Sequence, residues 1–415
     1  MTSLELQGQA AKSAAQTLAV AGTQLKNQAL SAIADALLAH TADILAANAA
    51  DLSAAQANGM TVSMQDRLRL TEERIRGIAD GVRQVAALPD PIGAAVSEAV
   101  RPNGLRISRR RVPLGVIGII YEARPNVTAD AAALCLKSGN AVILRGGKEA
   151  FRSNQALTEI MRNAMESAGL PKDAISLVQD TSRESANELM NLTAYLDVLI
   201  PRGGRGLIRA VTANAKVPVI RTGEGVCHTY VDESADLDMA CSIAYNAKCS
   251  RPSVCNAMEC LLVHRAVAEQ FLPLVKARLD VKSVEIRGDE TVRAVLGDAV
   301  VPATEEDWDT EYGDYILAVK VVDSLEEAID FCNLHGSGHS ECIVTESYTA
   351  AEQFLNAVDA AAVYVNASTR FTDGGEFGLG AEIGISTQKM HARGPMGLEE
   401  LTSTKFVVRG NGQVR

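Results

Sequence analysis

The stretch Gly115-Val116-Ile117-Gly118-Ile119-Ile120 is an unbroken apolar run of the kind that forms a buried parallel strand. The segment 129–137 after it predicts a helix closed by Gly139, and 141–144 predicts a second apolar strand. Further strands are predicted at 175–178, 197–200 and 217–220, with helices between them. Strands that alternate with helices predict an α/β fold, here a five-stranded parallel sheet with right-handed crossovers.

The segments on either side extend this pattern. Residues 4–88 carry apolar side chains at helical spacing, with a break at Asn58-Gly59, and predict packing helices without catalytic groups. The alternation of helices and strands starts again after Val231, which predicts a second α/β domain. The partly alternating run Arg106–Val112 predicts a projecting strand, and 405–415 an edge strand that pairs with another subunit.

Composition excludes several classes of protein. Hydrophobic residues make up 47% and charged residues 22% of the 415 residues, as in ordinary globular chains. The net charge of −11 argues against nucleic-acid binding, so an anionic ligand must be held by local cations. Eight dispersed cysteines and the lack of an export signal or long apolar run predict a cytoplasmic protein with reduced thiols and no membrane contact.

The stretch Asn246–His264 places three cysteines beside cations and a proline, just before an apolar strand. A thiolate nucleophile needs nearby positive charge to lower the thiol pKa from about 8.5, and Lys248 and Arg251 can supply it. Cys255, after Arg-Pro-Ser-Val, is the predicted nucleophile. Two alternatives stay open: buried structural cysteines, and a metal site or scaffold built on the C-x5-C-x4-C spacing, although zinc sites usually show closer pairs.

Glycine turns follow two of the predicted strands, at Arg145-Gly146-Gly147-Lys148 and at Gly203-Gly204. Such turns let a phosphate approach backbone N–H groups and helix N-termini. Neither contains G-x-G-x-x-G, so each alone is an ordinary turn. Together in one α/β unit they predict a dinucleotide site.

The order of these parts resembles the aldehyde dehydrogenase superfamily, and within it the branch of reductases that act on glutamyl phosphate. The resemblance runs along nearly the whole chain. It is carried by the segments 112–128, 139–147, 200–204, 225–228, 246–257, 311–313, 335–341 and 371–384.

The resemblance implies a fold of two parallel-sheet α/β domains with a small β flap for oligomerisation. Residues 1–97 and 114–230 would bind NADP(H), 231–395 would carry the catalytic cysteine, and 98–113 with 396–415 would form the oligomerisation strands. The implied reaction is reduction of L-glutamyl 5-phosphate by NADPH through a cysteine thioester. The implied partners are a second copy of the chain and a glutamate kinase that channels the substrate, with no metal.

The resemblance also assigns roles to residues. Cys255 would attack the acyl carbon, and its N–H with the Asn126 amide would stabilise the oxyanions; capping of the following helix is the alternative for Asn126. The expected substrate-binding residues are Arg124 and Arg370, because guanidinium suits carboxylate and phosphate. The expected cofactor-binding residues are Arg145, Gly146, Gly147, Lys148, Gly203, Gly204 and Glu311, with Arg145 and Lys148 near the 2′-phosphate.

A hydrolytic NAD(P)-dependent aldehyde dehydrogenase is the alternative function. Such enzymes carry a glutamate base on a strand upstream of the cysteine. Alignment on the acidic segment 234–238 places Thr222 at that position, and threonine is a poor base near pH 7. Glu224 would face the same side of a strand and could replace it if the register were shifted.

Overall fold

The computed structural model describes residues 1–415, apart from the side chain of Ser63. The chain forms two compact units. The first contains Met1–Thr222, Gly378–Gly384 and Met396–Arg415, and the second contains Gly223–Phe377 and Ile385–Pro395. The sequence interpretation kept 231–395 in one domain, whereas the structure places Gly378–Gly384 in the first unit. The reason is local, because the backbone of Gly380 lies against the Leu88 side chain and the Ile383 N–H donates to the Met396 carbonyl at 2.9 Å.

The first unit is built on a four-stranded parallel sheet in the order β5-β4-β3-β6. These strands are β3 (Val116–Tyr121), β4 (Ala141–Arg145), β5 (Ile175–Leu177) and β6 (Val198–Arg202). All six residues of β3 are buried, as the apolar run predicts. The fifth predicted strand, 217–220, is wrong: only Val219 bridges to Leu199. Pro218 has no N–H to continue a ladder.

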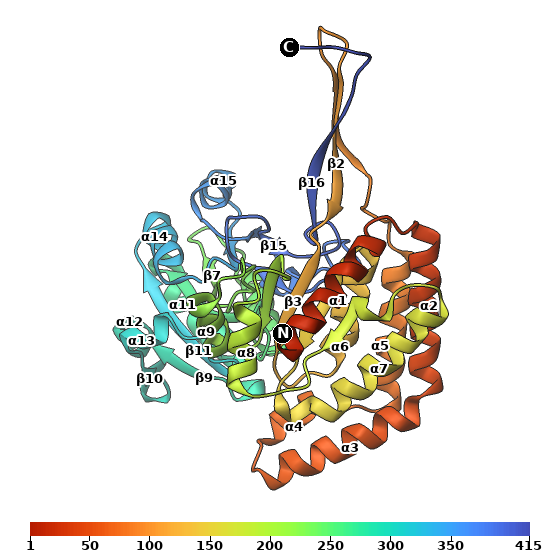
Figure 1. Cartoon of the computed structure of the whole chain (residues 1–415). Helices are drawn as coiled ribbons and strands as arrows, with labels where there is room; N and C mark the ends of the chain where they lie inside the picture. Colours follow the sequence, from red (N-terminus) through yellow and green to blue (C-terminus); the bar gives the residue numbers. More distant parts are fainter. The chain divides into compact units, whose positions relative to one another are not determined.

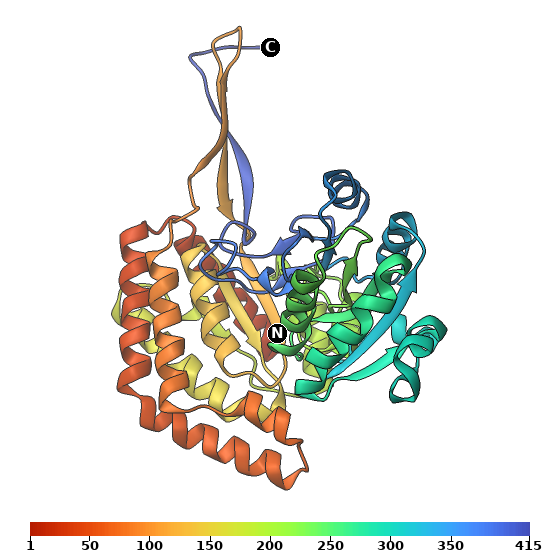
Figure 2. The ribbon, with the colours of Figure 1, turned by 180° about the vertical axis from the view of Figure 1, so that it is seen from behind.

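Two helical layers cover one face of this sheet, and α1, α8 and α9 lie toward the other (Figure 1). On the first face α6 and α7 contact the strands, and α2, α3 and α5 pack on these two helices. Helices α2, α3 and α5, red to orange, form the outer layer (Figure 1 and Figure 2). The helices of the unit are α1 (Ser3–Leu18), α2 (Thr23–Ala39), α3 (Thr41–Ala57), α4 (Val62–Leu68), α5 (Glu72–Ala87), α6 (Asn126–Lys137), α7 (Phe151–Ser167), α8 (Arg183–Met190) and α9 (Arg205–Asn214).

A three-stranded antiparallel arm extends from the first unit (Figure 1). It consists of β1 (Ala95–Val100), β2 (Arg106–Pro113) and β16 (Thr402–Arg409), in the order β1-β2-β16. All six residues of β1 are exposed. In β16, Phe406 is 70% exposed and Val408 is 54% exposed. The arm therefore presents apolar side chains that the described residues of this single chain leave uncovered.

The second unit contains a seven-stranded parallel sheet in the order β10-β9-β11-β8-β7-β12-β13. Its strands are β7 (Cys227–Val231), β8 (Met258–His264), β9 (Glu285–Gly288), β10 (Val301–Pro302), β11 (Ile316–Val322), β12 (Ser340–Val344) and β13 (Ala362–Val365). A small antiparallel pair, β14 (Ile385–Ser386) and β15 (Gly394–Pro395), belongs to the same unit.

Helices cover both faces of this second sheet. One apolar cluster packs α10, α11 and α12 against the strands, and another packs Trp308, α14 and α15 against them. The helices are α10 (Leu237–Cys249), α11 (Arg265–Leu279), α12 (Glu290–Leu296), α13 (Glu305–Trp308), α14 (Leu325–His335) and α15 (Tyr348–Ala357). The parallel α/β architecture predicted for both halves of the chain is confirmed.

Among the described helices, none is by itself long and apolar enough to cross a membrane. The pair α2 and α3, bent by 67°, passes that test by length and composition only when the two helices are taken together.

Candidate active site

Cys255 lies in the turn between α10 and β8. The apolar segments before and after this turn form the helix and the strand. All eight cysteines are described, and Cys255 is the one with a partly exposed side chain. Its neighbours in the motif are buried: burial raises the pKa of the Cys249 thiol and raises the pKa of Cys260 well above its ordinary range. A thiol in that state resists conversion to the nucleophilic thiolate. Of these three cysteines, Cys255 is therefore the one suited to attack a substrate.

The backbone of Cys255 is fixed by the segment that leads into β7. The carbonyl oxygen of Cys255 accepts a hydrogen bond from Cys227 Sγ at 3.3 Å. A Cβ added to Gly225 would lie 1.5 Å from the same oxygen, so only glycine fits there. On the other side of this segment, the Val226 N–H donates to Ser337 Oγ at 3.0 Å. The backbone of Cys255 thus rests on a contact with Gly225 that the sequence alone did not reveal.

Asn256, the residue after Cys255, ties the Cys255 turn to the segment that follows β13. Its Nδ2 donates to the carbonyls of Arg370 at 3.2 Å and Thr372 at 2.9 Å, and its own carbonyl accepts from Thr369 Oγ1 at 2.8 Å. Arg370 in turn donates from Nη1 to Asn256 Oδ1 and from Nε to Ser250 Oγ at 3.1 Å. The structure therefore brings two predicted site residues, Cys255 and Arg370, together.

A network of uncharged, hydrogen-bonded side chains supports the segment that follows β13. His339 Nδ1 lies 2.8 Å from Ser340 Oγ, and that hydroxyl lies 2.6 Å from Thr372 Oγ1. Burial lowers the pKa of the His339 imidazole to about 4, so the ring is uncharged near pH 7. Tyr364 OH, 2.6 Å from Thr372 Oγ1, completes the network. These groups position the loop and offer no general base to the thiol.

Lys248 is not the free charge that the sequence suggested for activating the thiol. Its side chain is buried on α10, and Nζ pairs with Glu259 Oε2 at 2.5 Å. Glu259 lies on β8, and its Oε1 accepts from the Gly313 N–H at 3.1 Å. Burial raises the pKa of the Glu259 carboxyl to about 7, with Lys248 acting in the opposite direction. This pair anchors the loop that holds Glu311 to the strand that follows Cys255.

In the first unit, the predicted cofactor residues gather at the carboxyl edge of the parallel sheet. Arg145 ends β4, and Gly203 and Gly204 follow β6, with β3 between these two strands. Ligands of open α/β sheets bind at this edge. The Gly204 N–H, at the start of α9, donates to Glu122 Oε2 at 2.9 Å, so a side-chain carboxylate already occupies that helix terminus.

Arg145 and Lys148 differ in what they can offer a phosphate. Nη2 of Arg145 donates to the carbonyls of Thr181 at 2.7 Å and Ser182 at 3.0 Å, and burial lowers the pKa of its guanidinium. Lys148 is exposed. The structure thus uses Arg145 to hold the loop after β5 and leaves Lys148 as the accessible cation of the turn.

The substrate-binding and oxyanion candidates of the first unit follow β3. Arg124 lies in the turn after this strand, and Asn126 is the first residue of α6. Asn126 does not cap this helix, because the N-cap is Pro125, and its Nδ2 donates instead to Asp130 Oδ2 at 2.9 Å. Burial raises the pKa of the Asp130 carboxyl to about 6, and the Asn126 hydrogen bond opposes that shift. The helix-capping alternative for Asn126 is wrong.

The position expected for a hydrolytic base holds no base. Thr222 is buried, and its hydroxyl donates to the Pro201 carbonyl at 2.7 Å. The expectation that Thr222 and Glu224 lie on one strand is wrong, because β7 begins only at Cys227. The alternation argument for Glu224 therefore loses its basis.

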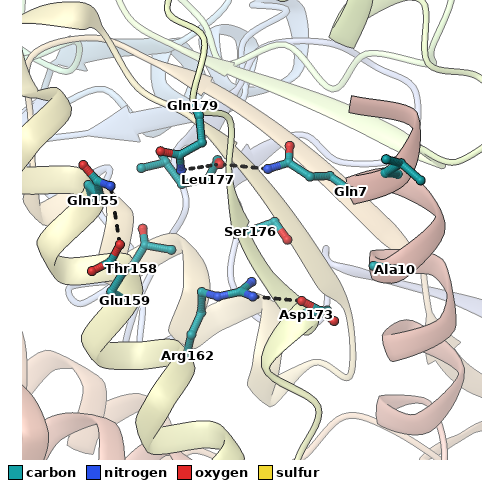
Figure 3. Close-up of a pocket in the computed structure, with 11 residues that line it drawn as sticks. Gln7, Ala10, Gln155, Thr158, Glu159, Arg162, Asp173, Ser176, Leu177 and Gln179 are labelled. Carbon is teal, nitrogen blue, oxygen red and sulfur yellow. Dashed lines mark hydrogen bonds and ion pairs between the residues drawn. The ribbon is translucent and has the colours of Figure 1, made fainter. Parts of the chain in front are cut away.

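Two further features lie apart from the predicted site residues. A cavity of about 380 Å³ lies beside α1, α7 and β5, where Gln7 donates to the Leu177 carbonyl and Arg162 pairs with Asp173 (Figure 3). None of the predicted site residues lines this cavity.

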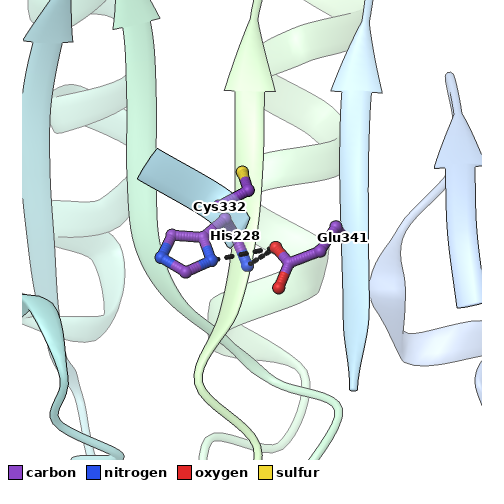
Figure 4. Close-up of side chains that lie close together, drawn as sticks. All are labelled: His228, Cys332 and Glu341. Atoms are coloured by element: carbon purple, nitrogen blue, oxygen red, sulfur yellow. Dashed lines mark hydrogen bonds and ion pairs between the residues drawn. The ribbon is translucent and has the colours of Figure 1, made fainter. Parts of the chain in front are cut away.

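The second feature is a buried cluster of potential metal ligands: His228, Cys332 and Glu341 (Figure 4). His228 Nδ1 and Glu341 Oε2 lie 2.9 Å apart. Among the described residues this is the one such cluster found, and it includes none of the three cysteines of the Asn246–His264 stretch.

Comparison with known proteins agrees with this arrangement. The model of the aldehyde dehydrogenase family matches residues 4–297 and 298–407. A gamma-glutamyl phosphate reductase of Moorella thermoacetica is 61% identical over 412 residues, 99% of this chain and 98% of that protein. One from Enterococcus faecalis is 60% identical over 415 residues, 100% and 99% of the two chains. The crystal structure of gamma-glutamyl phosphate reductase from Thermotoga maritima covers 100% of both chains, with a TM-score of 0.98 and 49% identity.

The family resemblance found in the sequence is confirmed by the family model, by relatives that match along the whole chain and by a closely superimposing structure. The chain belongs to the aldehyde dehydrogenase family.

Proposed function

We propose that this chain reduces L-glutamyl 5-phosphate to L-glutamate 5-semialdehyde and phosphate, the second step of proline biosynthesis from glutamate. The observation that carries the proposal is the match along the whole chain to relatives named gamma-glutamyl phosphate reductase. A partly exposed Cys255 with its turn held rigidly is the nucleophile that this chemistry needs.

The reaction proceeds through a thioester. Cys255 Sγ attacks the acyl carbon, the carbon–oxygen bond to phosphate breaks, and phosphate leaves with the electron pair. After reduction, the thiohemiacetal oxyanion collapses, the carbon–sulfur bond breaks, and the semialdehyde leaves as the Cys255 thiolate re-forms. The Cys255 N–H and the Asn126 amide are proposed to donate to the oxyanions, where preorganised donors have their largest effect. Arg124 and Arg370 are proposed to hold the anionic groups of the substrate.

The residues of the sheet edge fit a dinucleotide. A Cβ on Gly146 would lie 2.1 Å from Asn154 Nδ2, so the backbone of this turn passes close to a side chain of α7. The turn follows β4 at the edge where ligands of such sheets bind. We assign NADPH to the turn of Arg145, Gly146, Gly147 and Lys148, to Gly203 and Gly204, and to Glu311. When bound, NADPH supplies the hydride.

Lys148 is expected to bind the 2′-phosphate of NADPH, because it is the exposed cation of the turn that follows β4. Replacing Lys148 by Met should raise the KM for NADPH about tenfold or more, the equivalent of one charge-assisted hydrogen bond, and leave that for NADH nearly unchanged. Arg145→Met is the matched control. Because Arg145 donates hydrogen bonds to two backbone carbonyls, its replacement should weaken the binding of NADPH and of NADH to the same extent and lower the melting temperature. Equal weakening of NADPH and NADH by Lys148→Met would contradict the assignment.

The proposed function predicts that phosphate is an obligatory acyl acceptor in the reverse direction. With Thr222 hydrogen-bonded to Pro201, no base at this position activates water against the thioester. NADPH formation from glutamate 5-semialdehyde and NADP+ should therefore be sustained only with added phosphate, and absorbance at the nicotinamide band measures it. Sustained turnover in phosphate-free buffer with free glutamate as product would replace the proposal by the hydrolytic alternative.

The partners and location of the chain follow the same reasoning. We propose a homo-oligomer in which the arm of β1, β2 and β16 pairs with another copy, since Phe406 and Val408 are exposed on it. A glutamate kinase that hands over the labile acyl phosphate, and a cytoplasmic location, complete the proposal.

A further inference from the structure

Arg251 is an arginine without a counterion, four residues before the nucleophile. Its side chain is exposed, and among the described residues it forms neither an ion pair nor a hydrogen bond. Some exposed arginines pair with carboxylates, for example Arg74 with Asp66 and Arg265 with Asp323, and others do not, so what distinguishes Arg251 is its place beside Cys255. In a chain with 51 acidic and 40 basic residues, an unpaired arginine beside the nucleophile is a candidate for binding an anion that comes from outside.

Arg370 approaches the same turn from the other side. It donates to Ser250 Oγ at 3.1 Å and to Asn256 Oδ1, so its guanidinium spans residues that precede and follow Cys255. Both acceptors are neutral, and within the described chain no carboxylate lies at ion-pair distance from Arg370. These hydrogen bonds fix the direction of the guanidinium without neutralising its charge.

The two arginines lie close enough to influence each other. Burial lowers the pKa of the Arg370 guanidinium, and the positive charge of Arg251 lowers it further, while Cys255 and the Asp373 carboxylate act in the opposite direction. Neither arginine forms an ion pair with the described residues, so their like charges repel, and an anion with more than one negative charge placed between them would relieve that repulsion. Phosphate esters meet this requirement, because their oxygens accept two parallel hydrogen bonds from each guanidinium.

We propose that Arg251 and Arg370 form the site for the phosphoryl group that Cys255 displaces, and for inorganic phosphate in the reverse direction. This inference rests on the acyl-phosphate chemistry proposed above. As the carbon–oxygen bond breaks, its electron pair goes to the phosphate oxygen, whose negative charge grows. Contacts with two guanidinium groups therefore strengthen toward the transition state and accelerate the displacement.

The first test measures the anion site without relying on any enzymatic activity. Cys255 is alkylated with iodoacetate, which is anionic, and with iodoacetamide, which is neutral, and Cys255→Ala gives the background from other thiols. Arg251→Gln should lower the ratio of the two rate constants about tenfold, the usual effect of losing one charge-assisted contact. Arg251→Lys should lower it less, and inorganic phosphate should protect the wild-type thiol at lower concentration than it protects Arg251→Gln.

Arg265→Gln is the matched control. It removes one exposed positive charge from the same unit, but Arg265 follows the opposite end of β8 from Cys255 and pairs with Asp323. Its alkylation ratio should equal that of the wild type. An unchanged ratio and unchanged phosphate protection in Arg251→Gln would overturn the inference.

The second test separates the phosphoryl group from the other anionic group of the substrate, its carboxylate. In the oxidative direction, Arg251→Gln should raise the KM for phosphate about tenfold and leave the KM values for the semialdehyde and NADP+ unchanged. A raised KM for the semialdehyde with an unchanged KM for phosphate would overturn the phosphoryl assignment in favour of the carboxylate. A reduced alkylation ratio in a protein that does not use the semialdehyde would uphold the anion site and refute the proposed function.

Discussion

Cys255→Ala should abolish turnover while coenzyme binding and the melting temperature stay close to those of the wild type. Both steps of the proposed reaction pass through the sulfur of Cys255, so its loss should reduce kcat by about 10⁴-fold or more. The side chain is only partly buried, so its removal leaves no enclosed cavity of the kind that destabilises a core. NADPH-linked turnover, coenzyme fluorescence titration and thermal unfolding measure the three properties.

The controls for this variant are Cys249→Ala and Cys260→Ala. Both thiols are buried, and burial raises the pKa of each, so neither supplies a thiolate. Cys249→Ala should retain most of the activity. Any loss of activity in Cys260→Ala should be explained by the lower stability of that variant. Near wild-type turnover in Cys255→Ala would refute the nucleophile assignment, whichever control is affected.

Gly225→Ala should lower both stability and activity by displacing the backbone of Cys255. The new Cβ would lie 1.5 Å from the Cys255 carbonyl oxygen, 2.3 Å from its carbonyl carbon and 2.8 Å from its Cα. These are backbone atoms that cannot rotate away. We expect a loss of about 3 kcal/mol in the free energy of unfolding, at the upper end for overpacking. A displacement of about 1 Å at the reacting sulfur should lower kcat about 10²-fold.

Gly77→Ala is the control for the second prediction. Gly77 lies in α5 with no atom within 4 Å of the added Cβ, so alanine should stabilise this helix by about 0.5–1 kcal/mol. Urea unfolding and steady-state kinetics of both variants measure the difference. If Gly225→Ala matches the wild type in both measurements, the contact between Gly225 and Cys255 does not position the nucleophile.

The sequence was sufficient for the architecture because strands and helices depend on local patterns. The apolar run of β3 is long enough to be recognised alone, whereas the assignment of Cys255 as the nucleophile stays a prediction, which its partial exposure supports. The strand predicted at 217–220 does not form, because Pro218 has no N–H with which to continue the hydrogen-bonded ladder. The prediction gave more weight to the apolar residues of this segment than to its proline.

Contacts between distant segments could not be predicted. Lys248 looks like a free cation in the sequence, and only the packing of α10 on the sheet shows that it turns inward to Glu259. Arg145 looks equivalent to Lys148 until the loop at Thr181 and Ser182 supplies its carbonyl partners. The hydrogen bonds of Asn256 join segments more than a hundred positions apart, and no spacing rule anticipates them.

The discontinuity of the first unit has a consequence for synthesis on the ribosome. The seven strands of the second unit's sheet have all emerged once Val365 leaves the exit tunnel, but the first unit still lacks Gly378–Gly384 and β16. Until then β2, whose Pro113 pairs with Thr402, has one edge without its partner. A nascent chain therefore carries an incomplete N-terminal unit while the later domain folds, and its exposed strand edge is a target for chaperones during that interval.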